Sequence, residues 1–225
     1  MCMEMLSRYF DWSRSVCDQI IASHYRRKGV LFRDEILLQE VSRFTSQQTI
    51  ALDAGCGPDA SAVSVCAGQI RLAVGVDMIK EFHSVTAVKM CSADLESLPF
   101  KQCQFDLIIS RSVCEHLRNP VAVFKEFKRV LKPFGCVIMV TPNKYDYVSI
   151  VSRALPMAVK QKYFNLVFGT SAYDIFPTYY RCNAKGSIMR VAKASGFAVE
   201  KITPLRHYPY YLMFSPLLFR VGILY

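Results

Sequence analysis

The sequence predicts an α/β fold in which a doubly wound, mostly parallel sheet carries helices on both faces, giving three layers. Short apolar runs alternate with helical segments from residue 50 to about residue 203. Most of these runs are almost continuously apolar, as expected for parallel strands that are buried on both faces. The predicted strands cover residues 49–54, 72–77, 87–91, 105–110, 136–141 and 197–203.

The helical segments have the 3.6-residue apolar period of helices that pack against a sheet. The clearest is residues 121–132, where Val123 and Phe127 share one face while Lys, Glu and Arg occupy the other. Asn119 and Pro120 suit the N-cap and the first helical position. The other predicted helices are residues 4–24, 33–44 and 183–195.

These elements divide the 225 residues into three parts. Residues 1–47 are expected to form helices that cover a ligand crevice, residues 48–203 the α/β core, and residues 204–225 an aromatic, apolar C-terminal segment. Within the core, residues 143–181 are too long for a simple strand-to-helix connection. An insert at that position is expected to form a lid over a substrate.

Cysteine usage and the N-terminal sequence predict a cytoplasmic protein. The nine cysteines form no CxxC pair and lack the regular spacing of a zinc site or a disulfide framework. Charged residues, among them Glu4, Arg8 and Asp11, interrupt the apolar N-terminus. They break the uncharged stretch that a secretory signal needs.

Positive charge is concentrated in the last third of the chain. The net charge is +10, and residues 144–225 hold 11 of the 28 Lys and Arg but only 3 of the 18 Asp and Glu. More than half of the aromatic residues lie there too. Such a surface can meet an anionic substrate, lipid headgroups or nucleic acid. A basic solvated face over an aromatic core explains the same composition.

The segment most informative about function is IALDAGCGPD, residues 50–59, an apolar strand that runs into a glycine turn. In doubly wound sheets, ligands bind at the carboxyl ends of the strands, where glycine lets them approach the backbone. A side chain at Gly55 is therefore expected to occupy the ligand's volume. A dinucleotide site would need a third glycine where Ala60 stands, and Asp59 would repel a pyrophosphate. Asp53 and Asp59 favour a cationic ligand without phosphate, such as S-adenosylmethionine.

Two later strand ends also carry carboxylates. Asp77 ends the second strand, 24 residues after Asp53, where a carboxylate accepts hydrogen bonds from ribose hydroxyls. Asp94 follows the third strand, where it can accept from an adenine amino group while Leu95 covers the ring. Each aspartate could instead cap a helix, but three acidic strand ends in register favour one shared ligand.

Together these segments resemble the class I S-adenosylmethionine-dependent methyltransferase family, in its small-molecule, type 11-like branch, over roughly residues 48–203. Members of this family have a Rossmann-like fold. One departure is Asp59, where many relatives have a third glycine. The matching stretches are LDAGCG (52–57), VGVD (74–77), CSADLESLPF (91–100), FDLIISRSVCEHL (105–117) and VLKPFGCVIMVTPN (130–143).

The resemblance implies a role for each strand end. The glycine turn would hold the methionine end of S-adenosylmethionine, Asp77 the ribose, and Asp94 the adenine. Arg111 would lie below the transferable methyl group and contact the acceptor. The implied cofactor residues are Asp53, Ala54, Gly55, Cys56, Gly57, Asp77, Met78, Asp94, Leu95 and Ser110.

Methyl transfer is a direct displacement at an sp³ carbon, so the protein mainly aligns the acceptor and excludes water. A base is needed only for a hydroxyl or a protonated nitrogen. His116, shortly after the fourth strand, is the catalytic candidate; a structural residue at a helix start is the alternative. Certain members of the resembling family that methylate quinone precursors bind a metal near this histidine. No metal is predicted here, because Ser112 lacks the carboxylate that a further ligand would require.

Tyr179, Tyr180 and Arg181, at the end of the predicted lid, are candidate acceptor contacts. Arginine can clamp a carboxylate or a phosphate with two parallel hydrogen bonds. A packed aromatic cluster in which Arg181 caps a carbonyl fits the same residues. The run 174–183 resembles a bacterial subgroup often linked to polysaccharide or lipid-associated pathways. We therefore expect a small-molecule or a lipid- or saccharide-linked acceptor, methylated on oxygen or nitrogen.

Residues 208–225 are rich in Tyr, Phe, Leu and Met, but two prolines and an arginine interrupt them. The segment is too short and broken for a transmembrane helix. It suits a membrane surface with Arg206 and His207 at its edge, a subunit interface, or the cover of a sheet edge. The antiparallel last strand usual in this fold is not visible after Thr203, so a shortened C-terminus is expected.

Two further classes of function remain open from the sequence. An RNA methyltransferase fits the basic, aromatic last third. Against it, no RNA-binding module is appended, and residues 110–113 read SRSV where an NPPY-like tetrapeptide would stand. A non-catalytic cofactor-binding or scaffold protein of the same fold is the other.

Overall fold

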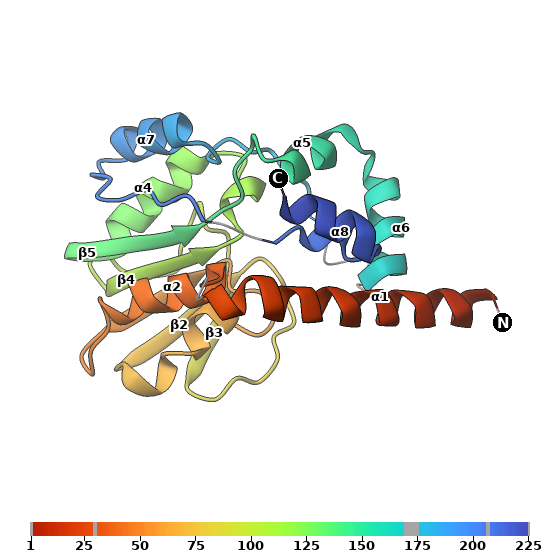
Figure 1. Ribbon diagram of the computed structural model, residues 1–225. Helices are drawn as coiled ribbons and strands as arrows, with labels where there is room; N and C mark the ends of the chain where they lie inside the picture. The colour runs from red at the N-terminus through yellow and green to blue at the C-terminus, as the bar shows by residue number, and fades with distance from the viewer. Residues whose placement is uncertain (1, 29–30, 169–175, 206–207, 225) are drawn as a thin grey trace. The chain divides into compact units, whose positions relative to one another are not determined.

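The computed structural model describes residues 2–28, 31–168, 176–205 and 208–224. The chain forms two compact units. The sheet unit comprises residues 36–146 and 178–203, and the helical unit comprises residues 1–35, 147–177 and 204–225. Figure 1 shows the elements of both.

The sheet unit contains five strands, in the order β3-β2-β1-β4-β5, and every neighbouring pair is parallel. The chain moves outward from β1 on one side and then from β4 on the other. This confirms the predicted doubly wound α/β fold. It also places the reversal of strand order, where such sheets bind ligands, at the carboxyl ends of β1 and β4. The strands are β1 (Ile50–Ala54), β2 (Leu72–Asp77), β3 (Val88–Ser92), β4 (Phe105–Arg111) and β5 (Leu131–Val140).

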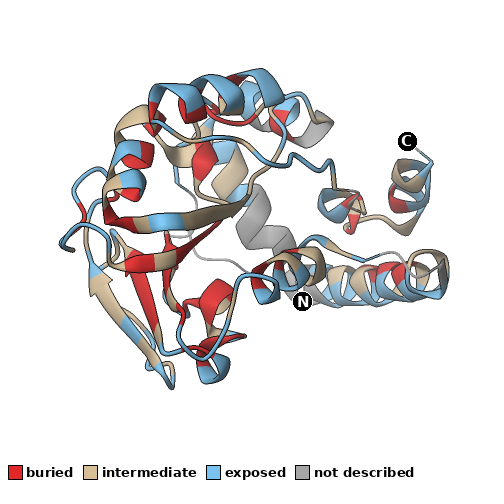
Figure 2. Ribbon diagram, turned by 90° about the vertical axis from the view of Figure 1, so that its left-hand side faces the viewer, coloured by how far each residue is buried: buried red, intermediate tan, exposed pale blue. Residues whose placement is uncertain are grey.

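Helices cover both faces of this sheet. Alternate residues of each strand point to opposite sides, and the strands are apolar on both sides, so both faces must be buried. Leu52 and Ile108 pack on one face with Phe127. Ala51 and Leu107 pack on the other. Figure 2 shows buried residues gathered along the central strands. The covering helices are α4 (Pro120–Val130) and α7 (Lys185–Ala194) on the first face, and α2 (Arg33–Ser42) and α3 (Ser61–Ser64) on the second.

The predicted start of α4 is confirmed, whereas its end differs. The Asn119 side chain accepts a hydrogen bond from the Ala122 N–H, and Pro120 occupies the first turn. The helix ends at Val130, two residues before the predicted end, because the chain enters β5 at once. The pairing of β5 with β4 is then irregular. The chain bulges outward there at Phe134, which is fully exposed and has a φ of +67°.

The sixth predicted strand, residues 197–203, is wrong. Its Phe, Val and Ile favour a strand, but it pairs with no strand among the described residues. The Phe197 N–H donates to the Ala192 carbonyl at the end of α7, and Ile202 is 38% exposed. Residues 197–203 have strand-favouring side chains, but without an adjacent strand their backbone cannot form the hydrogen bonds of a sheet.

The helical unit joins three segments that are distant in sequence. Cys17 and Ile21 of α1 form its core with Met213 and Phe219 from the C-terminal segment. The buried Ser13 hydroxyl donates to the Met213 carbonyl at 2.7 Å. The C-terminal segment is therefore partly core. The helices are α1 (Cys2–His24), α5 (Tyr147–Ala154), α6 (Met157–Phe168) and α8 (Pro216–Ile223), with 3-10 turns at Arg26–Lys28 and Tyr210–Leu212.

Two sequence-based expectations in this unit fall outside the described residues. Arg206 and His207, expected at the edge of a membrane-surface segment, are among them, and so are residues 169–175 of the predicted lid. Across the described part of the chain, no helix combines the length and the apolar character needed to cross a bilayer.

Candidate functional site

A glycine turn closes the carboxyl end of β1. The N–H groups of Gly55 and Cys56 both donate to the Val76 carbonyl, at 2.8 and 3.0 Å. Gly55 and Gly57 have φ of +76° and +64°, a left-handed conformation that side chains disfavour. The turn is thereby tied to β2 at the predicted ligand edge.

The two glycines are required for different reasons. A Cβ at Gly57 would meet nothing within 4 Å, so its free side faces open space. A Cβ at Gly55 would come within 2.3 Å of the Val113 side chain. The expectation that a side chain at Gly55 would fill the ligand's volume is therefore wrong, because it would collide with the protein itself. Gly57 is the glycine that leaves room for a ligand.

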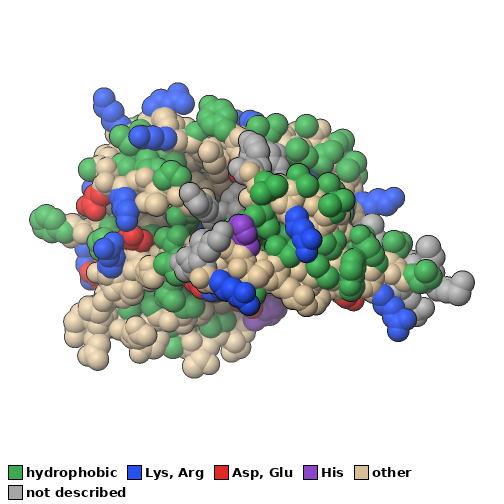
Figure 3. Space-filling view, viewed as in Figure 1, with side chains coloured by type: hydrophobic (Ala, Val, Ile, Leu, Met, Phe, Trp, Pro, Cys, Tyr) green, Lys and Arg blue, Asp and Glu red, His purple; other side chains and the backbone are tan. Residues whose placement is uncertain are grey.

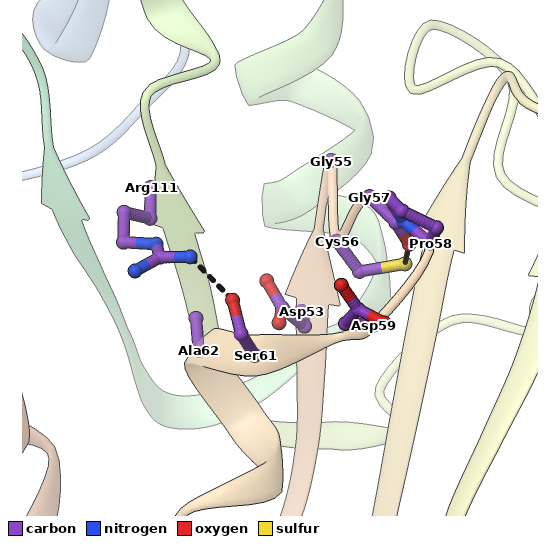
Figure 4. Close-up of a pocket in the computed structure, with 9 residues that line it drawn as sticks. All are labelled: Asp53, Gly55, Cys56, Gly57, Pro58, Asp59, Ser61, Ala62 and Arg111. Carbon is purple, nitrogen blue, oxygen red and sulfur yellow. Dashed lines mark hydrogen bonds between the residues drawn. The ribbon is translucent and has the colours of Figure 1, made fainter. Parts of the chain in front are cut away.

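A pocket of about 280 Å³ lies against this turn (Figure 4). That volume is slightly below the ~300 to 1,000 Å³ of sites that enclose a whole small molecule, so the pocket suits one end of a larger ligand. Its charged residues are Asp53, Asp59 and Arg111. The complete lining is Asp53, Gly55, Cys56, Gly57, Pro58, Asp59, Ser61, Ala62 and Arg111.

Asp53 is the buried carboxylate of the pocket, with only 1% of its surface exposed. Its Oδ2 accepts a hydrogen bond from the Val63 N–H at 3.1 Å. Burial raises the pKa of Asp53 to about 6, although the N–H groups of Val63 and Ala62 and the charge of Arg111 act in the opposite direction. The carboxylate also occupies the first N–H groups of α3, which a bound phosphate would otherwise use.

The raised pKa of Asp53 predicts how stability depends on pH. The folded protein holds the Asp53 proton more tightly than the unfolded chain, so this stabilisation is present below about pH 4 and is lost by about pH 6. Asp53→Asn does not titrate. Relative to the wild type, the variant should therefore gain up to about 3 kcal/mol between these pH values. Urea unfolding of both proteins from pH 4 to pH 7 measures the difference, and a constant difference would contradict the prediction.

Asp77 joins the end of β2 to the glycine turn. Its Oδ2 accepts from the Gly57 N–H at 2.8 Å, and its Oδ1 accepts from the Ile79 N–H at 3.3 Å. Met78, beside it, is 72% exposed. The carboxylate thus stands at the same edge as the pocket, as the sequence predicted.

The other predicted cofactor residues lie outside the pocket lining. Asp94 is exposed after β3, and its Oδ1 accepts from the Glu96 N–H. Leu95 is buried in the core. Ala54 and Ser110 are buried on their strands. Their roles toward a cofactor remain predictions.

His116 ends a 3-10 turn, η3 (Cys114–His116), directly beyond β4. Its backbone N–H donates to the Val113 carbonyl at 2.8 Å. The neighbouring Glu115 is buried and accepts from the Thr141 hydroxyl at 3.2 Å. The turn is therefore held firmly against β5, and a catalytic role for His116 remains a prediction. Within the described ranges, His, Cys, Asp and Glu form no cluster of three that could hold a metal ion.

The candidate acceptor residues gather around this turn. The N–H groups of Tyr179 and Tyr180 both donate to the Glu115 carbonyl. Arg118 donates to the Tyr179 hydroxyl at 2.6 Å, and Arg181 donates to the Arg118 carbonyl at 2.6 Å. Arg181 thus caps a backbone carbonyl, which is one of the two roles that the sequence left open for it. Tyr180 is buried, whereas Arg118 and Arg181 are exposed.

The sequence did not predict where three residues at the site lie: Ser61, Arg111 and His83. Ser61 lines the pocket and accepts a hydrogen bond from Arg111, which the sequence had placed with the acceptor. His83 Nδ1 lies 2.6 Å from Asp59 Oδ1 at the rim. Ser61 is only four residues after Gly57, and this closeness to the glycine turn could have indicated that it lines the pocket. Nothing in the sequence links His83 to Asp59.

Comparison with known sequences finds a family model described as a methyltransferase domain, which matches residues 52–139. An uncharacterized protein of Methanocaldococcus jannaschii is 33% identical over 119 residues, which cover 50% of this chain and 52% of that protein. A "Probable S-adenosylmethionine-dependent methyltransferase" of Mycobacterium tuberculosis is 25% identical over 138 residues, covering 60% of this chain and 48% of that protein. The chain thus spans about half the length of these relatives.

Among solved structures, an S-adenosylmethionine-dependent methyltransferase from Mesorhizobium loti resembles the chain with a TM-score of 0.55. The sequences are 17% identical, and the match covers 80% of this chain and 89% of that one. At this identity the likeness concerns the fold, and it agrees with the doubly wound sheet.

Proposed function

We propose that this chain, whose core belongs to the class I S-adenosylmethionine-dependent methyltransferase family, transfers the methyl group of S-adenosylmethionine to a small-molecule or lipid- or saccharide-linked acceptor. The observation that carries the proposal is the acidic glycine pocket at the end of β1. It lies at the reversal of strand order, and the family match begins on its strand, at residue 52.

The pocket residues fit the cofactor. S-adenosylmethionine supplies an electrophilic methyl group on a sulfonium and carries no phosphate. Asp53 and Asp59 would attract its positively charged end, and the open side of Gly57 leaves room for it. Asp53 also takes up N–H groups at the start of α3, which disfavours a pyrophosphate there. Asp77 would hold the ribose.

The chain's own contribution to transfer would be alignment and proton removal. η3 and the loop at residues 178–183 are bonded to each other, because Tyr179 and Tyr180 donate to Glu115. This fixes His116 close to the strand end from which an acceptor would approach. His116 would remove the proton of a hydroxyl or ammonium acceptor.

An anionic group on the acceptor would suit the same loop. The guanidinium groups of Arg118 and Arg181 lie 5.3 and 5.9 Å from the Tyr179 ring centroid. Both arginines are exposed, and each retains donors beyond the hydrogen bond described above. Two such cations beside His116 favour a carboxylate- or phosphate-bearing acceptor.

Methyl transfer from labelled S-adenosylmethionine into a cell extract tests this proposal. The extract is separated into lipid, small-molecule, RNA and protein fractions after reaction. We expect label in the lipid or small-molecule fraction, and His116→Ala to reduce it. Label confined to RNA would support the RNA methyltransferase instead. Tight cofactor binding without transfer to any fraction would support the non-catalytic alternative.

We further propose that α8 lies on an anionic membrane surface. Leu217, Val221 and Leu224 are 72%, 57% and 86% exposed and share one face, whereas the buried Phe219 faces the core. A helix that is apolar on both sides needs a second apolar environment, and Arg220 would meet anionic headgroups. Figure 3 shows hydrophobic side chains over α8, with a basic side chain among them.

Co-sedimentation with anionic and neutral vesicles tests this surface. A variant with Ser at Leu217, Val221 and Leu224 should lose binding to anionic vesicles and remain folded, because these side chains are exposed. The matched control places Ser at Val65, Phe134 and Met189, exposed apolar residues of the sheet unit. Equal vesicle binding by the two variants would exclude α8 as the contact.

A further inference from the structure

We propose that Arg111 binds the carboxylate of the cofactor's methionine end, and that it thereby selects ligands that carry an intact amino acid. The inference rests on the proposed function, since it assigns a residue to S-adenosylmethionine. It replaces the sequence-based assignment of Arg111 to the acceptor.

The strand register places Arg111 beside Asp53. Asp53 of β1 is paired with Ile109 of β4. Alternate residues of a strand share a face, so Arg111 points to the same side as Ile109 and Asp53. That side is covered by α3, where Ser61 begins the helix. Ser110 points to the opposite face and cannot serve the pocket in this way.

The side chain of Arg111 is held in the pocket. Its Nη2 donates to the Ser61 hydroxyl, and Figure 4 shows the guanidinium directed at Ser61. The charge of Arg111 lowers the pKa of Asp53, against the larger effect of burial. A guanidinium carries five N–H donors, so one arginine side chain can bond to a serine hydroxyl and to a ligand carboxylate at the same time.

Charge balance explains why the pocket needs a cation. Asp53 and Asp59 suit an ammonium or sulfonium, but two carboxylates alone would repel the carboxylate of an amino acid. Among the lining residues, Arg111 is the one that carries positive charge. A pocket lined by both negative and positive charges matches a zwitterionic group. Its volume of about 280 Å³ suits one end of a ligand.

Calorimetric titration of the full chain separates this role from a purely structural one. The two probes are S-adenosylhomocysteine and its decarboxylated analogue, which lacks only the carboxylate. For Arg111→Gln we expect roughly 10- to 100-fold weaker binding of S-adenosylhomocysteine, the effect of losing a charged hydrogen bond, and less than about 3-fold change for the analogue. Arg111→Lys, which keeps the charge, should recover part of the loss.

Arg71→Gln is the matched control, since Arg71 is an exposed arginine outside the pocket lining. It should leave both affinities unchanged. If Arg111→Gln weakens the binding of both probes equally, Arg111 only supports the structure of the pocket. If the affinity for S-adenosylhomocysteine is unchanged, Arg111 does not bind the cofactor, and its sequence-based assignment to the acceptor stands instead. If the wild type binds neither probe, the proposed function itself fails.

Discussion

Gly57→Val is expected to abolish binding of S-adenosylhomocysteine while the protein remains folded. A Cβ at Gly57 would meet no protein atom within 4 Å, and Gly57 lines the pocket, so we expect the valine side chain to stand where the ligand must lie. The left-handed φ of +64° adds a conformational cost of roughly 1 to 2 kcal/mol. We expect more than about 100-fold loss of affinity by calorimetry, corresponding to at least ~2.7 kcal/mol.

Gly196→Val is the control for the backbone cost. Gly196 has a φ of +76° and also faces open space, but it follows α7, outside the pocket lining. The two variants should lose similar stability in urea unfolding, and only Gly57→Val should lose the ligand. Normal affinity in Gly57→Val would show that the ligand does not lie against the turn.

Asp77→Ala is expected to weaken cofactor binding by about 10²- to 10⁴-fold. Two ribose hydroxyls would lose a charged acceptor, and each such hydrogen bond contributes roughly 1.5 to 3 kcal/mol. The variant also removes the acceptor for the Gly57 N–H, which loosens the turn that carries the pocket. Calorimetric titration with S-adenosylhomocysteine measures the combined effect.

Glu81→Ala provides the comparison for Asp77→Ala, because it removes an exposed carboxylate four residues away. Its affinity should be that of the wild type. If circular dichroism shows both proteins folded and their affinities are equal, Asp77 does not hold the cofactor.

Local patterns were sufficient to predict the centre of the fold. β2 has the predicted bounds, and β1, β3 and β4 differ by one residue at one or both ends. These strands are short apolar runs bounded by turn residues, and burial on both faces leaves such runs few alternatives. The glycine turn and its acidic neighbours follow directly from β1, so the pocket could be located from sequence.

Contacts between distant segments were not predictable in the same way. The core of the helical unit joins α1 to Met213 and Phe219, some 200 residues later, and no local pattern marks that pairing. The position of Arg111 depends on the register of β1 with β4, which decides the face on which its side chain lies. The need for Gly55 likewise comes from Val113, a residue on another segment.

Titration of the full chain with S-adenosylhomocysteine and with NAD, by calorimetry under the same conditions, tests the central claim most directly. The two ligands share an adenosine, but only NAD carries a pyrophosphate. The N–H groups at the start of α3 are bonded to Asp53, and Asp59 stands beside them, so a pyrophosphate lacks donors there. We predict binding of S-adenosylhomocysteine and none of NAD. Equal or tighter binding of NAD would contradict the assignment.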